Sequence, residues 1–522
     1  MKQQLCLFSF LFFALSNLFA QHTNILISNS DSPNEPSICI NPKNPQQVVA
    51  GANLNHVYYS TDGGASWQES AVSCSWGIWG DPVISVDTTG SFLFLHLSNP
   101  PAPGNWIDRI IAQKSNNGGI TWSNGSYMGL NGAKAQDKHW IATDWKTNAL
   151  YVTWTQFDNY GTSSPSDSSV ILFSKSTNGG ASWSAAKRIS KLAGDCVDSD
   201  YTAEGAVPAV GPNGEVYVAW SNRNKIWFDR SLDGGDTWLS EDIFVSDQPG
   251  GWDYEVPGIY RANGLPVVTC DTSGGPNHGT IYINWSDQRN GPTDTDIWLA
   301  KSTDGGTTWS APLRVNNDSG NRHQFFTWMT IDQTTGWLWF VFYDRRNHTG
   351  NLTDVYMAVS KDGGGTFQNF KVSEQPFLPN STLFFGDYTN LSVVNNLVRP
   401  IWARLHEGDL SVWTALVNPD AVVPVQEPLE SESFFNLDNP YPNPFNDVTG
   451  FSFKLHRSAT VSLSLMDLQA NLCARLIDRE WRGIGKYLEK IDAKRLGITP
   501  GTYFILLEVD GKVSRRKVVF VE

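Results

Sequence analysis

Short apolar runs recur along residues 22–417, and polar segments rich in glycine, asparagine and aspartate separate them. Many runs carry β-branched or aromatic residues, which is typical of β-strands bounded by turns. The runs come in groups of three. The third strand of each group is expected at residues 56–60, 109–115, 170–176, 225–231, 296–302, 354–360 and 410–416. The second strand is expected at residues 47–53, 92–98, 150–156, 215–222, 280–287, 337–344 and 397–404, and an inner strand precedes each pair.

Six of the seven third strands end in the same loop, which has a serine, an Asp or Asn two residues later, two glycines and a closing Trp or Phe. The Asp or Asn can accept backbone hydrogen bonds and close a tight turn, and the glycines allow positive φ. The closing aromatic residue can pack between sheets. Because turn chemistry explains every position, we expect a structural role. The loops are residues 60–67, 115–122, 176–183, 231–238, 302–309 and 360–367.

The loop resembles the Asp box of sialidase-like β-propellers, and a repeat of this period is typical of a propeller or a solenoid. Residues 24–29 are similar to the strands that follow the boxes, so they could complete the last sheet and leave no open edge. We therefore predict an all-β chain with a seven-bladed β-propeller at residues 21–417. The alternative is six blades, one per box, as in the sialidase catalytic domain, which would leave residues 387–417 unexplained.

The first 20 residues have the pattern of a signal peptide. Lys2 precedes an apolar stretch that ends at Ala20, and no later run is long and apolar enough to cross a bilayer. We expect an exported protein with no transmembrane segment after signal removal. The 522-residue chain has a formal net charge of −14 and no dominant basic patch, which argues against a nucleic-acid partner.

A second unit is expected at the C-terminal end. Residues 418–435 are rich in Pro, Glu and Ser and predict a linker. The charge then changes sign, from −17 before residue 435 to +3 from there onward, which favours a separate domain at residues 436–522. The run Asn-Pro-Tyr-Pro-Asn-Pro-Phe-Asn at 439–446, the Gly-Thr-Tyr strand at 501–507 and the basic end resemble the type A C-terminal sorting domain of the type IX secretion system.

That resemblance implies a small β-sandwich and the type IX secretion machinery as a partner. It also implies passage across the outer membrane of a Gram-negative bacterium, with release into the medium or attachment to the cell surface.

Acidic residues precede or open most of the expected inner strands, on the face opposite the boxes. Inner strands line a propeller's axis, so these carboxylates could form a ring at the mouth of the channel. Like charges raise one another's pKa or require a cation, so structural calcium stays open while no organic cofactor is expected. The alternative is that each carboxylate caps its own turn. The acidic positions are Glu35, Asp81, Asp137, Glu204, Glu255 and Asp387.

Arginines follow several second strands on the same face, often as Asp-x-Arg, which permits either an anion clamp or a plain salt bridge. Sialidases use a tyrosine nucleophile, and as a family they hold the sugar carboxylate with three arginines. By analogy, Tyr254 and Glu255 could act as the tyrosine–glutamate pair. The first clamp arginine is missing from residues 35–39, and no arginine precedes Arg109. The catalytic candidates are Tyr254, Glu255, Arg289, Arg345, Asp387 and Arg404.

Two functional hypotheses follow for a glycan or glycoprotein partner. A glycosidase, with a true exo-sialidase as one form of it, requires a deep pocket that holds Arg289, Arg345, Glu255 and Asp387 together. A non-catalytic propeller that binds a polysaccharide or a protein requires a shallow face whose Asp–Arg pairs are satisfied internally. The missing first arginine favours binding or another glycan activity over sialidase chemistry.

Overall fold

The computed structural model describes residues 22–101, 105–419, 435–467 and 471–521. The expected signal peptide at residues 1–20 and most of the expected linker lie outside these ranges. The chain divides into two compact units, Met1–Pro424 and Val425–Glu522. No helix in the described part of the chain has the length and apolar character needed to span a membrane.

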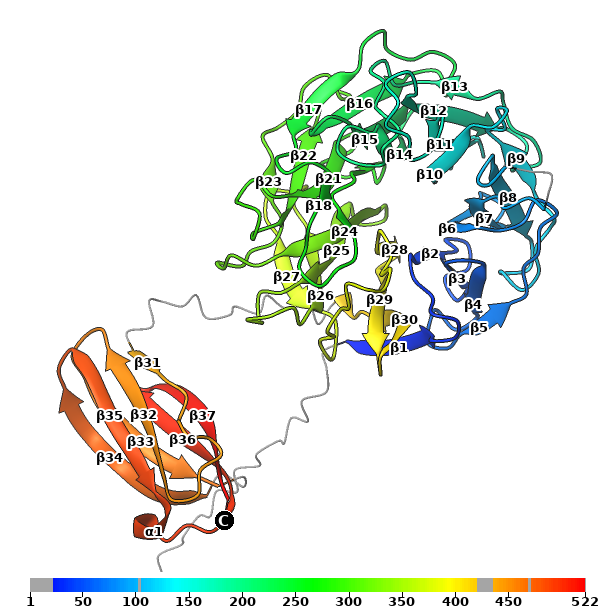
Figure 1. Cartoon of the computed structure of the whole chain (residues 1–522). Coiled ribbons are helices and arrows are strands. Elements are labelled where there is room, and N and C mark those ends of the chain that lie inside the picture. Colours follow the sequence, from blue (N-terminus) through cyan, green and yellow to red (C-terminus); the bar gives the residue numbers. More distant parts are fainter. Residues whose placement is uncertain (1–21, 102–104, 420–434, 468–470, 522) are drawn as a thin grey trace, which may run out of the picture. The chain divides into compact units, whose positions relative to one another are not determined.

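The described residues of the first unit form seven four-stranded antiparallel sheets, arranged around a ring with each sheet running from an inner to an outer strand (Figure 1). The first three sheets contain β2 (Ser37–Ile40), β3 (Val48–Ala52), β4 (His56–Ser60) and β5 (Gln68–Ser70); β6 (Gly80–Val86), β7 (Phe92–Leu97), β8 (Ile110–Ser115) and β9 (Ser126–Met128); and β10 (Ala135–Thr143), β11 (Leu150–Phe157), β12 (Ser169–Ser176) and β13 (Lys187–Arg188).

The next three sheets repeat this order. They contain β14 (Glu204–Val210), β15 (Val216–Ser221), β16 (Lys225–Ser231) and β17 (Ile243–Asp247); β20 (Val267–Cys270), β21 (Ile281–Asp287), β22 (Asp296–Ser302) and β23 (Leu313–Arg314); and β24 (Gln324–Asp332), β25 (Trp337–Asp344), β26 (Asp354–Ser360) and β27 (Gln368–Lys371). A short hairpin of β18 (Asp253–Tyr254) and β19 (Ala262–Asn263) precedes β20.

The seventh sheet combines the two ends of the unit. It contains β28 (Asn390–Val394), β29 (Leu397–His406), β30 (Asp409–Leu416) and the N-terminal strand β1 (Thr23–Ser28). Strand β1 runs antiparallel to β30, with Leu26 opposite Trp413. The prediction that the first strand completes the last sheet is confirmed. The inner strands contact one another in order around the ring, and β28 returns to β2.

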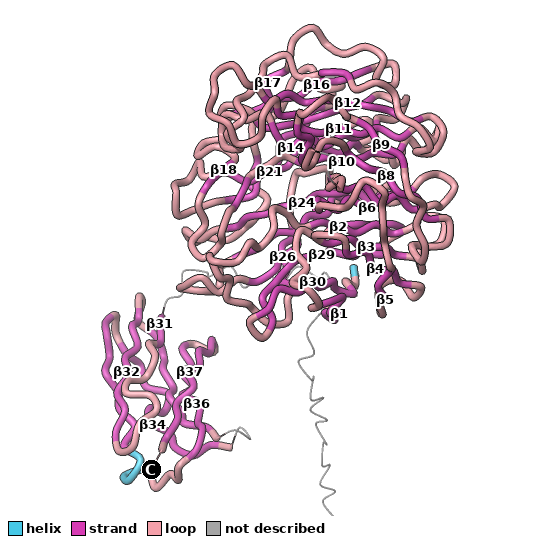
Figure 2. Tube along the Cα trace, turned by 45° about the vertical axis from the view of Figure 1, so that its right-hand side comes forward, coloured by secondary structure: helices cyan, strands magenta, loops and turns pink. Residues whose placement is uncertain are grey.

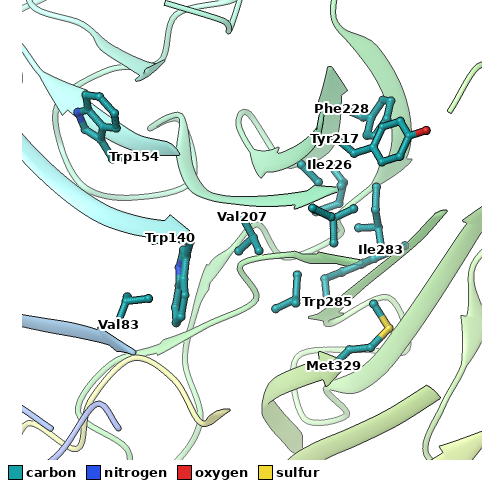
Figure 3. Close-up of a cluster of buried hydrophobic side chains, with 14 of the residues drawn as sticks. Val83, Trp140, Trp154, Val207, Tyr217, Ile226, Phe228, Ile283, Trp285 and Met329 are labelled. Atoms are coloured by element: carbon teal, nitrogen blue, oxygen red, sulfur yellow. The ribbon is translucent and has the colours of Figure 1, made fainter. Parts of the chain in front are cut away.

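The core lies between neighbouring sheets. Figure 3 shows Trp140, Val207 and Trp285, which come from three different sheets, in one buried cluster. Trp154, Trp220, Trp285 and Trp402 occupy the same register on the second strands of four sheets and are fully buried. Burying an aromatic side chain of this size contributes several kcal/mol on area grounds, at ~25 cal/mol per Å².

The Asp boxes are turns whose side chains bind the turn itself. In the first box, Asp62 Oδ1 accepts hydrogen bonds from the backbone N–H groups of Ala65 (3.0 Å) and Ser66 (2.9 Å), and Ser60 Oγ accepts from the N–H of Gly64 (2.8 Å). Hydrogen bonds from Ser66 and Ser60 lower the pKa of Asp62 to about 2. Each carboxylate is used inside its turn, which agrees with the predicted structural role.

The second unit is built from two antiparallel sheets around one core. One sheet contains β31 (Phe435–Leu437), β32 (Val448–Leu455) and β35 (Gly485–Asp492), and the other contains β34 (Leu472–Arg482), β33 (Ala459–Met466), β36 (Gly501–Val509) and β37 (Lys512–Phe520). A short helix, α1 (Ala493–Leu496), follows β35. Apolar side chains from both sheets, including Phe453, Leu463 and Ile505, are buried together. This is the small β-sandwich expected from the sequence. Figure 2 distinguishes the strands of both units from their connecting loops.

Candidate functional site

A cavity of about 460 Å³ opens at the inner ends of the sheets, within the size range of small-molecule sites. Loops of the first three sheets and the segments before β20 and β28 form it. Its lining combines acidic side chains, two cations and several aromatic rings. The residues used below are Glu35, Asn53, Trp79, Asp81, Trp106, Asp137, Lys138, Tyr160, Arg261 and Phe384.

Three charged residues of the cavity occupy strained backbone positions. Glu35, Asp81 and Lys138 have φ values of 48°, 52° and 50°, and each lies at or just before the start of an inner strand. Gly205 and Phe326 take the same conformation at the starts of β14 and β24. Register shifts mark β-bulges at these points in β6, β10, β14 and β24. A bulge re-aims its side chain, and strain at a charged, buried residue indicates function.

An ion network closes the floor of the cavity. Lys138 Nζ donates to Asp387 Oδ2 at 2.7 Å, and the Arg261 guanidinium binds the same carboxylate through Nε (2.9 Å) and Nη2. Arg261 Nη1 donates to Asp198 Oδ2 at 3.1 Å. Burial alone would raise the pKa of Asp387, but Lys138 and Arg261 outweigh it and hold that pKa below its ordinary value. Asp387 is therefore ionised and fully paired.

Three other buried acids have pKa values well above their ordinary range. For Glu35 the cause is burial, with a further contribution from Asp81. Burial also raises the pKa of Asp137 against the opposing charge of Lys138, and burial together with Asp198 and Asp137 raises that of Glu204. The pKa values of these three groups are shifted in the opposite direction from that of Asp387, so burial favours the neutral form of some acids in the site while the cations favour the ionised form of Asp387.

Asp81 differs from these acids in its surroundings. Its carboxylate lies 3.6 Å from Lys138 Nζ, and its backbone N–H donates to Asn53 Oδ1 at 2.8 Å. The side chain is 10% exposed, it lines the cavity, and its Oδ2 has no hydrogen-bond partner in the described structure. A buried acceptor without a partner is costly, so this oxygen is available to a ligand.

Aromatic rings form the wall above these charges. The rings of Trp79 and Trp106 are perpendicular, with centroids 5.6 Å apart, and Trp106 meets Tyr160 at 82° and 5.4 Å. Tyr160 is fixed by its hydroxyl, which donates to Asp198 at 2.7 Å. Trp79 and Trp106 are partly exposed. Indole faces of this kind pack well against the apolar face of a sugar ring.

The channel below the cavity is filled. Trp140 packs against Trp328 at 4.2 Å between centroids and against Tyr388 at 5.2 Å. A pocket of about 30 Å³ lies beside them. The cavity is therefore a blind pocket and not the mouth of an open channel.

The structure places the predicted catalytic residues apart. Asp387 lies in the ion network. Tyr254 is buried and its hydroxyl donates to the carbonyl oxygen of Asn263, while Glu255 is exposed. Arg289 pairs with Asp287 and lies over Trp298.

The two remaining arginines bind backbone carbonyls elsewhere. Arg345 is buried and donates to Pro257 O at 2.7 Å, and Arg404 donates to Gln375 O at 3.4 Å. Burial lowers the pKa of Arg345 to about 10. None of the three expected partners of Asp387, which are Arg289, Arg345 and Glu255, is among the residues that bind it in the described structure.

The predicted carboxylate ring is better matched by the structure. Glu35, Asp81, Asp137, Glu204 and Asp387 are all buried. The sequence analysis missed the cations Lys138 and Arg261 and the acid Asp198. One signal for Lys138 was available, because it directly follows Asp137 at the start of an inner strand. Arg261 and Asp198 come from loops, and no sequence period places them. In the described part of the chain, no group of three or more His, Cys, Asp or Glu side chains is arranged to hold a metal ion.

Comparison with known proteins gives one family match, the BNR/Asp-box repeat at residues 58–69. Solved structures with a similar arrangement include the Hadza microbial sialidase Hz136, with 14% identity, a TM-score of 0.41, and coverage of 72% of this chain and 74% of that one. The α-L-arabinofuranosidase Arb93A from Fusarium graminearum has 14% identity and a TM-score of 0.43, with coverage of 65% of this chain and 97% of that one. Trypanosoma rangeli sialidase has 14% identity and a TM-score of 0.40, with coverage of 87% of this chain and 85% of that one. No curated protein sequence matches. These values assign no substrate to this chain.

Proposed function

We propose that the first unit binds the end of a glycan chain in the central cavity and hydrolyses its glycosidic bond. One observation carries the proposal: Asp81 and Lys138, both in strained backbone positions, line one cavity with the buried Asp137, whose pKa burial raises, beneath a wall of tryptophans. Glycoside hydrolysis usually requires a neutral carboxylic acid and an ionised carboxylate on opposite sides of the scissile bond. A blind pocket favours attack at a chain end.

The two carboxyl groups divide these roles by environment. Asp137 lines the cavity and burial raises its pKa, so it takes the role of the acid that donates a proton to the leaving oxygen. Asp81 takes the second role, since its Oδ2 lies 3.6 Å from Lys138 Nζ and has no hydrogen-bond partner in the described structure. It attacks the anomeric carbon or activates a water molecule. Both oxygens of Glu35 accept hydrogen bonds, from Asn53 Nδ2 and from the backbone N–H of Asp387, which makes Glu35 a positioning residue.

This role assignment disfavours sialidase chemistry. Arg261 is the single arginine among the described lining residues, and its donors are engaged by Asp387 and Asp198. A clamp for a sugar carboxylate needs several free guanidinium groups. The acids of the cavity would also repel such a sugar.

The test is sugar release from a panel of polysaccharides and a sialylated glycoprotein, measured by mass spectrometry. We expect release of a monosaccharide or disaccharide from a polysaccharide without sialic acid. The Asp81→Asn and Asp137→Asn variants should lose about 10²–10⁴-fold in rate, as expected for groups that transfer protons or attack. A Glu241→Gln variant, which changes an exposed acid on the unit's surface, is the matched control. Full activity in both site variants would overturn the assignment.

A non-catalytic propeller is the second candidate, and a separate observation favours it. Two Asp-x-Arg segments are satisfied internally, as this alternative requires, with Arg289 on Asp287 and Arg346 on Asp344. Retained binding to one glycan, without release of any product, would support this alternative and remove the hydrolase.

We further propose that the protein is exported, with residues 1–20 as its signal peptide and the second unit as a type IX sorting domain. The Pro-rich run at 439–446 and the basic strand β37 support this proposal. The location would be the medium or the surface of a Gram-negative bacterium. Expression in a bacterium with this secretion system, with and without residues 425–522, tests it. The shortened chain should stay in the periplasm, and its appearance outside the cell would contradict the proposal.

A further inference from the structure

The cations of the cavity are paired with acids of the same site, so an anionic ligand would have to compete with those acids. Lys138 is held by Asp387 and Asp81, and Arg261 by Asp387 and Asp198. The group that lacks a hydrogen-bond partner in the described structure is an acceptor, Asp81 Oδ2, which lies 3.6 Å from Lys138 Nζ in a side chain that is nine-tenths buried. A ligand that satisfies this site must therefore bring hydrogen-bond donors.

The balance of charges in the cavity indicates which charge such a ligand should carry. Six acidic side chains surround two cations, Lys138 and Arg261. The acids outnumber the cations, and burial raises the pKa values of Glu35, Asp137 and Glu204 because their ionised forms are poorly compensated there. A buried excess of negative charge favours a positively charged ligand. The six acids are Glu35, Asp81, Asp137, Asp198, Glu204 and Asp387.

The aromatic wall points to the same kind of ligand independently. Trp79 stands perpendicular to Trp106, and Trp106 stands nearly perpendicular to Tyr160. Rings set at right angles form a corner, and the faces of such rings attract a cation placed against them. The same faces pack against a sugar, so an aromatic corner above carboxylates suits a sugar that carries an ammonium group.

We infer that the glycan unit recognised by this cavity bears a free ammonium group, as a deacetylated amino sugar does. This inference rests on the proposed glycan function and names its substrate class. The ammonium lies against Asp81 and donates to its Oδ2, while the sugar face packs on Trp79 or Trp106. A neutral sugar leaves the charge of the cavity uncompensated, and a uronic or sialic acid adds to the repulsion.

Calorimetric titration of the full chain tests the inference with three matched disaccharides: β-1,4-linked diglucosamine, di-N-acetylglucosamine and cellobiose. We expect diglucosamine to bind at least about tenfold more tightly than the other two, the value of one charge-assisted hydrogen bond. Asp81→Asn should remove this preference. Asparagine tolerates positive φ, so the variant keeps the local backbone. Glu241→Gln should keep the preference.

A second measurement distinguishes recognition of the ammonium group from tight binding of the sugar ring alone. An ammonium beside Asp137 and Glu35 favours their ionised forms, so binding of diglucosamine should release protons. The release appears as a binding enthalpy that depends on the ionisation enthalpy of the buffer. Cellobiose should give no such dependence.

The outcomes distinguish failure of the ammonium inference from failure of the proposed glycan function. Equal binding of cellobiose and diglucosamine would overturn the ammonium inference and leave the glycan function intact. An Asp81→Asn variant that keeps the preference would also overturn it. If no sugar binds, both the inference and the proposed function fail.

Discussion

At the scale of single residues, the most informative position is Lys138. Its φ of 50° would suit the glycine that the fourth sheet has at the same point, Gly205. The chain instead places a buried lysine there, between Asp387 and Asp81. A buried cation of this kind is retained at a cost in desolvation, which its two partners offset. Its function is to keep Asp387 ionised and to face Asp81 with a fixed positive charge.

Replacing this lysine should therefore have a pH-dependent cost. Lys138→Met leaves the buried Asp387 with Arg261 alone, and we expect a loss of about 3–5 kcal/mol in unfolding free energy at pH 7. The folded-state pKa of Asp387 lies below its ordinary value, so its stabilising effect is present above pH ~4 and is lost as the pH falls through the folded pKa. The deficit of the variant should shrink in acid.

Denaturant unfolding of the wild type and of Lys138→Met measures this effect between about pH 3 and pH 7, a range that includes the pH at which ordinary carboxyl groups titrate. Lys43→Met, at an exposed loop position, is the control and should cost less than about 0.5 kcal/mol. A deficit that does not change with pH would show that Lys138 contributes packing alone.

At the scale of the sheets, a recurring contact joins neighbours. The next-to-last residue of a third strand reaches the first glycine carbonyl of the following Asp box. Lys114 Nζ donates to Gly179 O (3.1 Å), and Lys301 Nζ donates to Gly363 O (2.8 Å). Lys175 makes the same bond to the box at 231–238. The Asp box thus presents a carbonyl to the preceding sheet as well as closing its own turn.

Loss of one such contact should destabilise the propeller more than loss of a surface ion pair. For Lys301→Met we expect a cost of about 1.5–3 kcal/mol, the value of a hydrogen bond to a charged group. For Lys225→Met, which removes the exposed pair with Asp247, we expect about 0–1 kcal/mol. Denaturant midpoints compare the two variants. Equal costs would contradict a specific role for the inter-sheet bond.

The sheets could be predicted from the sequence because the Asp box, its glycines and the alternation of apolar residues indicate the same strand positions. The box fixes the end of the third strand, and the alternating apolar runs fix the strands before it. The carboxylate ring followed from the same period. The cations could not be found this way, because Arg261 reaches Asp387 from the β18–β19 hairpin. Arg289, predicted as part of a clamp, pairs locally with Asp287, two residues before it in the chain.

At the scale of the whole propeller, closure of the ring depends on its first strand. Residues 24–29 resembled the outer strands of other sheets, and that resemblance was sufficient to predict the pairing of β1 with β30. The structure adds a second link, to the sixth sheet. Asn24 Nδ2 donates to Val372 O (2.9 Å), and Asn24 Oδ1 accepts from the backbone N–H of Glu374 (2.9 Å). One side chain thus bridges residues 350 positions apart.

Asn24→Ala should weaken this closure without changing a core residue. It removes two hydrogen bonds and leaves two backbone groups without their partners, so we expect a loss of about 1–3 kcal/mol in unfolding free energy. Because closure removes the open sheet edges, the variant should also exchange the amide hydrogens of β1 and β30 faster than the wild type. Asn29→Ala, at an exposed position just beyond β1, is the matched control. Unchanged exchange in β1 would show that strand pairing alone holds the ring shut.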